Sequence, residues 1–213
     1  MNTNNHLKPK DYLNATIEAG IGAIPVIGGP IQTLYFGLQN EKRFQRIEKF
    51  YELLNKELTL IQRSIPTTVN KNIEEQLIAI IETINLEVEM VRSKDKTRYF
   101  INSYKNLLLR VNKNNLDLEE LFIDILSSLN KIEIDLLTLL YNDRYSDNGG
   151  MLLPKINGTD SSIIYGSMNK LVNHGLVNER DRNLSTLGHD KYAYKISSIG
   201  ISLCDYILKI PGE

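Results

Sequence analysis

The residues of this chain best suited to binding chemistry lie between residues 160 and 191, in two groups. Polar side chains recur at helical spacing in the first group: Ser161, Ser162, Tyr165, Asn169, Lys170 and Asn173. The second group supplies cations: Arg180, Arg182 and Lys191. Side chains of these types bond to phosphates, to base edges or to polar groups of a protein partner. They predict a binding surface.

Patterns for catalysis or metal binding are missing from the sequence. His174 and His189 stand near no cysteine or serine arranged as a nucleophile with its base. No HExxH motif, cysteine pair or spaced carboxylate cluster predicts a metal site. The single cysteine, Cys204, lies in an apolar helical pattern, where a buried, inert thiol is expected. We therefore expect a non-enzymatic protein without catalytic residues, cofactor or metal.

A helix over residues 160–174 must hold the first group. Apolar residues such as Ile164, Met168 and Leu171 recur at three- and four-residue steps, which places them on one helix face. Asp160 or Ser161 can cap the amino end. Gly175 stands where the helix should end, because glycine adopts left-handed backbone angles at little cost.

A hairpin must hold the second group. A strand is predicted from Leu176, and a returning strand near residues 192–197 has alternating apolar and polar positions. The polar run between them contains Gly188 and is typical of a loop. A closing helix is predicted after Ser197.

These elements resemble the winged helix-turn-helix of MarR-like and PadR-like regulators. The resemblance rests on residues 170–177 (KLVNHGLV) and 194–200 (YKISSIG) and covers about residues 130–210. It implies a first helix from about residue 130, a short second helix within 151–157 and a turn at 158–159. It also implies that the helix after the turn enters the DNA major groove while the wing contacts the backbone or minor groove.

The charge balance tempers the expectation of DNA binding. From residue 130 on, acidic residues slightly outnumber basic ones. Phosphate neutralisation supplies most non-specific DNA affinity, so weak binding is expected unless a dimer doubles the surface. Winged helices also dock protein partners, and that alternative stays open.

Composition predicts a globular, mainly α protein with a small α+β part. The 213 residues are 42% hydrophobic with a net charge of −1, which argues against a disordered chain and against a polybasic coat protein. Four parts are predicted: a flexible tail (1–12), an apolar helical hairpin (13–38), a helical bundle (39–129) and a winged-helix domain (130–213). Apolar stripes predict bundle helices near 30–62, 71–92, 95–111 and from 115 or 117, which could also form a dimer.

The apolar hairpin is the most unusual stretch. No charged residue occurs from Ala19 to Leu38, but Pro25 to Pro30 should break the helix. Its apolar side chains include Ile21, Ile24, Val26, Ile27, Ile31, Leu34 and Phe36. A buried core hairpin, a membrane-associating hairpin and an oligomer contact all fit. The layout resembles uncharacterised bacterial proteins from phage-related and defence loci.

Two hypotheses from different classes follow. The first is a bacterial or phage DNA-binding regulator in the cytoplasm, since no secretory signal is evident and one cysteine forms no disulfide framework. The second is an effector or scaffold at the cytoplasmic face of the membrane, whose winged helix docks a protein partner. Both are expected to self-associate through the helical region.

Overall fold

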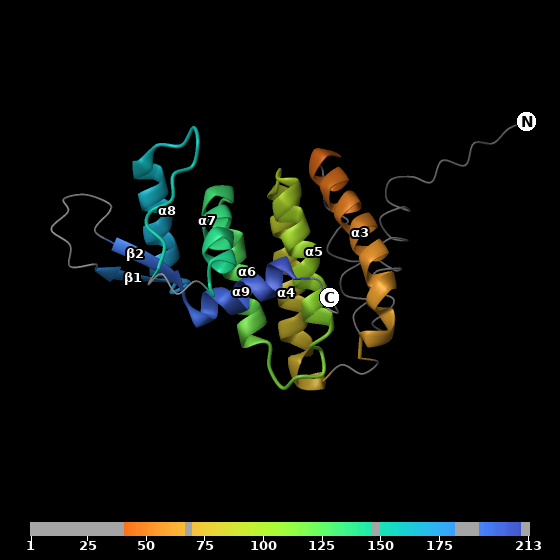
Figure 1. The fold of residues 1–213 in the computed structure, drawn as a ribbon. Helices are drawn as coiled ribbons and strands as arrows, with labels where there is room; N and C mark the ends of the chain where they lie inside the picture. Colours follow the sequence, from red (N-terminus) through yellow and green to blue (C-terminus); the bar gives the residue numbers. More distant parts are fainter. Residues whose placement is uncertain (1–40, 67–69, 146–149, 182–191, 210–213) are drawn as a thin grey trace, which may run out of the picture. The chain divides into compact units, whose positions relative to one another are not determined.

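The described part of the chain is mainly helical and contains one small antiparallel sheet (Figure 1). A computed structural model describes residues 41–66, 70–145, 150–181 and 192–209. The described residues divide into two compact units, one up to residue 123 and one from residue 124 to residue 209. The sequence placed the division at residue 130. The predicted tail and the apolar hairpin, with all seven apolar residues named for it, lie outside the described residues.

Three helices make up the core of the first unit. They are α3 (Glu41–Ile61), α4 (Glu74–Met90) and α5 (Lys94–Leu108), and each packs against the other two (Figure 1). Short 3-10 turns, Gln62–Ser64 and Lys71–Ile73, stand between α3 and α4. A further helix, α6 (Asp117–Ser128), begins in this unit and ends in the second. The periodicity predicted these helices.

The stripes that predicted the helices are the buried ones. Ile47, Leu54, Ile80, Ile84 and Tyr104 are all at most 2% exposed. One polar pair within this core is hydrogen-bonded: the buried Tyr51 hydroxyl donates to Asn85 Oδ1 at 2.8 Å. Burial raises the pKa of the Tyr51 phenol well above its usual value.

A buried ion pair joins α3 to α5. The Lys105 ammonium has no exposed surface, and its Nζ lies 2.8 Å from Glu57 Oε2. Arg98 reaches the other Glu57 oxygen at 2.8 Å. The hydrogen bond from Lys105 lowers the pKa of the Glu57 carboxyl below its usual range. Since a buried ammonium is costly without a partner, Glu57 is a condition for this packing.

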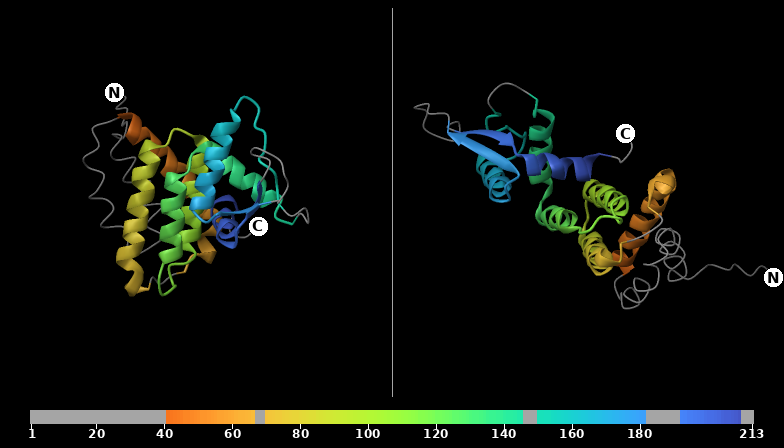
Figure 2. Two further views of the ribbon diagram at one scale, coloured as in Figure 1. Left: turned by 90° about the vertical axis from the view of Figure 1, so that its left-hand side faces the viewer. Right: turned by 90° about the horizontal axis from the view of Figure 1, so that it is seen from below.

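The second unit is built on α7 (Lys131–Asn142). Helix α7 packs against α8 (Ser161–Asn173), α9 (Ser198–Leu208) and strand β2 (Tyr192–Ile196), and strand β1 (Val177–Asp181) packs against α8. The two strands pair antiparallel, and Figure 2 shows this hairpin beside α8.

The prediction of a short second helix within residues 151–157 is wrong. Met151 instead forms a β-bridge with Tyr194, each amide donating to the other's carbonyl at 2.8 Å. The chain from Leu152 to Ile156 has no regular secondary structure. Pro154 explains this, because it has no N–H to donate and disfavours helical angles at the residue before it.

None of the helices in the described residues combines the length and the hydrophobicity needed to cross a bilayer. The charge-free stretch from Ala19 to Leu38 is not among those residues.

The ion pair of Lys105 generates a stability prediction. Glu57→Gln leaves a buried ammonium unpaired and should lower the free energy of unfolding by about 3 kcal/mol. The double variant Glu57→Gln, Lys105→Met removes both charges and should recover most of that loss. Urea unfolding followed by circular dichroism measures both.

The same pair should make stability depend on pH. The folded pKa of Glu57 is lowered, so its contribution is present above the unfolded value of about 4.3 and is lost as the pH falls below it. Glu57→Gln should therefore flatten the acid limb of the stability profile. Equal acid limbs for the wild type and this variant would contradict the assignment.

Candidate nucleic-acid interface

Local capping fixes both ends of α8. The Asp160 carboxylate accepts from the Ser162 amide at 2.7 Å and from the Ser162 hydroxyl at 2.6 Å. These hydrogen bonds, the side-chain one foremost, lower the pKa of Asp160. At the other end Gly175 has a φ of +70°, the left-handed turn predicted for it. The helix therefore begins and ends where the sequence indicated.

The outer row of α8 is made of small polar residues. Ile164, Met168 and Leu171 face the core. The side turned away from them carries, at steps of four, three and four residues, Ser162, Gly166, Asn169 and Asn173. Of the other predicted residues, Ser161 is exposed and Tyr165 is half-buried. The helix thus presents hydrogen-bonding groups without charge.

Gly166 is a glycine that packing does not require. A Cβ added there would meet no atom within 4 Å. At Gly200 in α9, by contrast, a Cβ would lie 2.2 Å from the Leu176 carbonyl oxygen, so close packing demands glycine. A glycine inside a helix costs about 0.5–1 kcal/mol relative to alanine. Gly166 therefore lowers helix stability with no gain inside the molecule, and it opens the backbone to close approach.

Strand pairing separates charges across the β1–β2 hairpin. Val177 pairs with Ile196 and Glu179 with Tyr194, and these pairs share one face, on which Val177, Tyr194 and Ile196 are buried. Asn178 pairs with Lys195 and Arg180 with Ala193, so the two cations share the other face. Arg180 and Lys195 are both exposed. The nearly neutral sequence thus yields a locally basic surface.

Lys170, one of the predicted binding residues, has partners inside its own unit. Its ammonium lies 2.9 Å from Glu133 Oε2 and donates to the Ser128 carbonyl at 2.6 Å. The Glu133 side chain is only 5% exposed and also accepts a hydrogen bond from the backbone amide of Asn130 at 2.7 Å. Lys170 therefore neutralises a buried carboxylate within its own unit.

Two predicted cations, Arg182 and Lys191, lie outside the described residues. The sequence prediction did not include three further candidate binding residues, Lys195, Gly166 and Asn178. The signal for Lys195 was present in the alternation of the second strand, but only the strand register places it beside Arg180.

A second polar group lies where α7 meets α9. The Tyr141 hydroxyl donates to the Asp205 carboxylate, which also pairs with Lys209 at 2.6 Å. The Arg144 guanidinium stacks on the Tyr141 ring at 3.9 Å and on the Tyr145 ring at 4.4 Å. Burial, and then the bond to Asp205, raises the pKa of Tyr141. These contacts join the end of α7 to α9.

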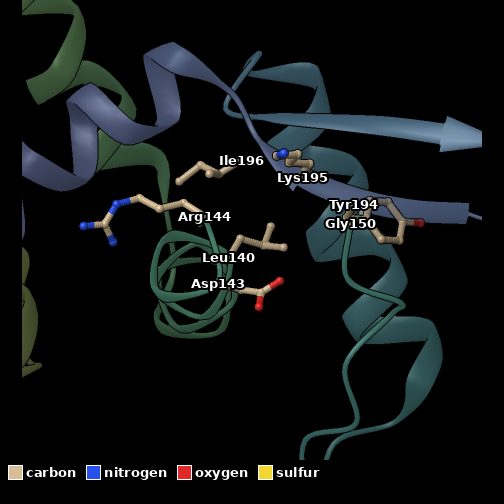
Figure 3. A pocket seen from close by; sticks show the side chains of 7 residues that line it. All are labelled: Leu140, Asp143, Arg144, Gly150, Tyr194, Lys195 and Ile196. Carbon is tan, nitrogen blue, oxygen red and sulfur yellow. The ribbon is translucent and has the colours of Figure 1, made fainter. Parts of the chain in front are cut away.

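A small hollow beside this group is lined by Leu140, Asp143, Arg144, Gly150, Tyr194, Lys195 and Ile196 (Figure 3). Its space of about 10 Å³ holds about one water molecule. Figure 3 shows the Arg144 guanidinium directed away from Lys195, so the two cations do not converge on one ligand. The hollow is too small for a substrate.

Chemistry of other kinds has little support among the described residues. They contain no group of three or more histidine, cysteine or acidic residues able to hold a metal ion. Cys204 is buried, and its burial raises the pKa of the thiol to about 12. A thiol so rarely ionised is a poor nucleophile. His174 caps the carboxyl end of α8, with Nε2 3.3 Å from the Ser128 hydroxyl.

No family model, curated protein or solved structure matches the chain.

The contrast between the two glycines can be measured. Gly166→Ala adds a methyl group into open space and should raise the free energy of unfolding by about 0.5–1 kcal/mol. The matched control Gly200→Ala should lower it, because its Cβ meets the Leu176 carbonyl oxygen. Thermal unfolding of both variants tests this. A destabilising Gly166→Ala would mean that packing needs this glycine after all.

Proposed function

We propose that the chain is a non-enzymatic DNA-binding protein, a bacterial or phage regulator that acts as a dimer. Residues from about 130 to 210 act as a winged helix-turn-helix in which α8 enters the major groove and the β1–β2 hairpin contacts the phosphate backbone. The observation that carries the proposal is the pairing of an uncharged polar helix face with a hairpin face that gathers Arg180 and Lys195.

The outer row of α8 supports the helix part of the proposal. Asn169 and Asn173 offer amide groups that can pair with base edges, and Ser162 offers a hydroxyl for bases or phosphates. Gly166 in the middle of the row lets a groove wall approach the helix backbone. If helix stability alone determined the residue at position 166, alanine would be expected there.

The hairpin supports the phosphate part. Arg180 and Lys195 lie on the same face of the described hairpin with both side chains exposed, and Asn178 adds an exposed amide on that face. Since Lys170 is committed to Glu133, it adds little to phosphate binding. Two cations per chain predict weak binding with a shallow salt dependence, and two copies would strengthen the binding and steepen that dependence.

The chain departs from the winged helix-turn-helix pattern in the segment between α7 and α8. Residues 151–157 lack the short second helix, and Met151 adds a bridge to the edge of the hairpin instead. The proposal therefore depends on α8 and the hairpin rather than on a complete helix-turn-helix.

The alternative is a membrane-associating effector or scaffold whose winged helix docks a protein partner. One observation favours its docking part: Ile163 on α8 is 51% exposed and Leu152 before α8 is 41% exposed. Apolar side chains on the same stretch as the polar row suit a protein surface better than a phosphate backbone. Its membrane part depends on residues 13–38, outside the described structure.

Charge reversal on the hairpin separates these functions. Arg180→Glu with Lys195→Glu should weaken binding to duplex DNA at least about tenfold and lower the slope of log affinity against log salt by about two for each bound chain. The control Arg63→Glu makes the same kind of change at an exposed cation in the first unit and should alter neither quantity. Fluorescence anisotropy over a salt series measures both.

An unchanged affinity and an unchanged salt slope in the double variant would contradict DNA binding through the hairpin. Wild-type protein with no affinity for duplex DNA at low salt would leave the docking function as the better account.

A further inference from the structure

An apolar stripe on α4 faces solvent. Leu86 is 63% exposed and Met90 60% exposed, while Ala79 is exposed and Thr83 half-buried. The Thr83 hydroxyl donates to the Ala79 carbonyl at 3.0 Å, so covering Thr83 leaves no donor unsatisfied. These four residues follow one another at steps of four, three and four, the spacing of a coiled-coil seam. The opposite face of α4 already packs in the core.

Charges flank the stripe in an uneven way. Glu82 lies on one side of it and Glu87 on the other, both half-buried. Glu75 is exposed near the start of α4, and the exposed cations Arg92 and Lys94 follow its end. Within the described residues, the side chains of Glu75, Arg92 and Lys94 form no ion pair. They are available to another molecule.

We propose that this stripe is the surface on which a second copy of the chain docks, α4 against α4 in antiparallel orientation. The twofold axis passes between Thr83 and Leu86, so that Ala79 of one copy meets Met90 of the other. This inference deepens the proposed function and rests on it in one respect: the dimer explains how a surface with few cations could hold DNA.

The ends of α4 favour the antiparallel pair. At a rise of about 1.5 Å per residue, Glu75 lies about 14 Å before the proposed axis, and Met90, the last residue of α4, lies about 8 Å beyond it. Arg92 and Lys94 follow Met90 in the chain, so antiparallel docking brings Glu75 of each copy toward the end of α4 that carries these cations in the other. The twofold axis makes this pairing occur twice.

The size of the stripe sets the expected strength. Stable interfaces bury about 800 Å² per partner, and a seam of four residues covers less than that. A dissociation constant in the micromolar range is the result expected.

Sedimentation equilibrium of the full chain without DNA, up to about 200 μM, tests the proposal. Wild type should dimerise. Leu86→Asp with Met90→Asp should be monomeric throughout, with an unchanged circular dichroism spectrum because both side chains are exposed. The control Leu60→Asp replaces a leucine of α3 that is 80% exposed and should leave the dimer intact.

A charge exchange tests the orientation. Glu75→Arg alone, and Arg92→Glu with Lys94→Glu alone, should each raise the dissociation constant about tenfold, and the three changes together should restore it.

A monomeric wild type, or a dimer that survives Leu86→Asp with Met90→Asp, would overturn the proposal. A dimer lost in that variant but not rescued by the charge exchange would overturn the antiparallel orientation. A monomeric wild type would leave the stripe to residues 19–38 or to another protein. Because no DNA is present, failure here is distinct from failure of the hairpin variant to lose DNA affinity.

Discussion

The buried carboxylate of Glu133 is the constraint on which the second unit depends. It accepts from the Asn130 amide at 2.7 Å, which completes the capping box of α7, and from the Lys170 ammonium of α8 at 2.9 Å. Lys170 in turn donates to the Ser128 carbonyl at the end of α6. A carboxylate that is 5% exposed would be costly without these partners. The contacts therefore set α8 against α7 and turn its polar row outward.

This arrangement has a consequence for charge. The one cation of α8 is used to neutralise Glu133, so the outward face of the helix is polar but uncharged. In the proposed DNA-binding function, the hairpin supplies the positive charge, because its register places Arg180 and Lys195 on one side and Glu179 on the other. A chain with a net charge of −1 can in this way present a basic surface. Because this surface has few cations, a second copy of the chain would strengthen binding to a polyanion.

Periodicity and capping made the local structure predictable. The stripe through Leu77, Ile80 and Ile84 predicted α4, and Asp160 with Gly175 bounded α8, because these signals depend only on neighbouring residues. Register and long-range pairing were not predictable in this way. Lys170 looked exposed because Glu133, 37 residues away, gives no local signal, and Lys195 gained its place only through β1.

The residues 151–157 show the limit of predicting an element from resemblance. The winged-helix pattern implied a helix there, but Pro154 disfavours helical structure at this position, and the segment instead contributes the Met151 bridge. Gly166 shows the reverse case, since its identity is plain in the sequence but its meaning requires the empty space around it. Sequence alone therefore predicted the candidate helix well and the chemistry of its surroundings poorly.

An NMR titration of the ¹⁵N-labelled full chain with duplex DNA at low salt tests the central claim most directly. The account predicts that amide shift changes gather on the outer row of α8, at Ser162, Gly166 and Asn173, and on the hairpin at Asn178 and Lys195. Amides of α4 should change little, apart from effects of dimer formation seen equally without DNA. Shift changes that avoid both α8 and the hairpin, or none at all, would contradict the account.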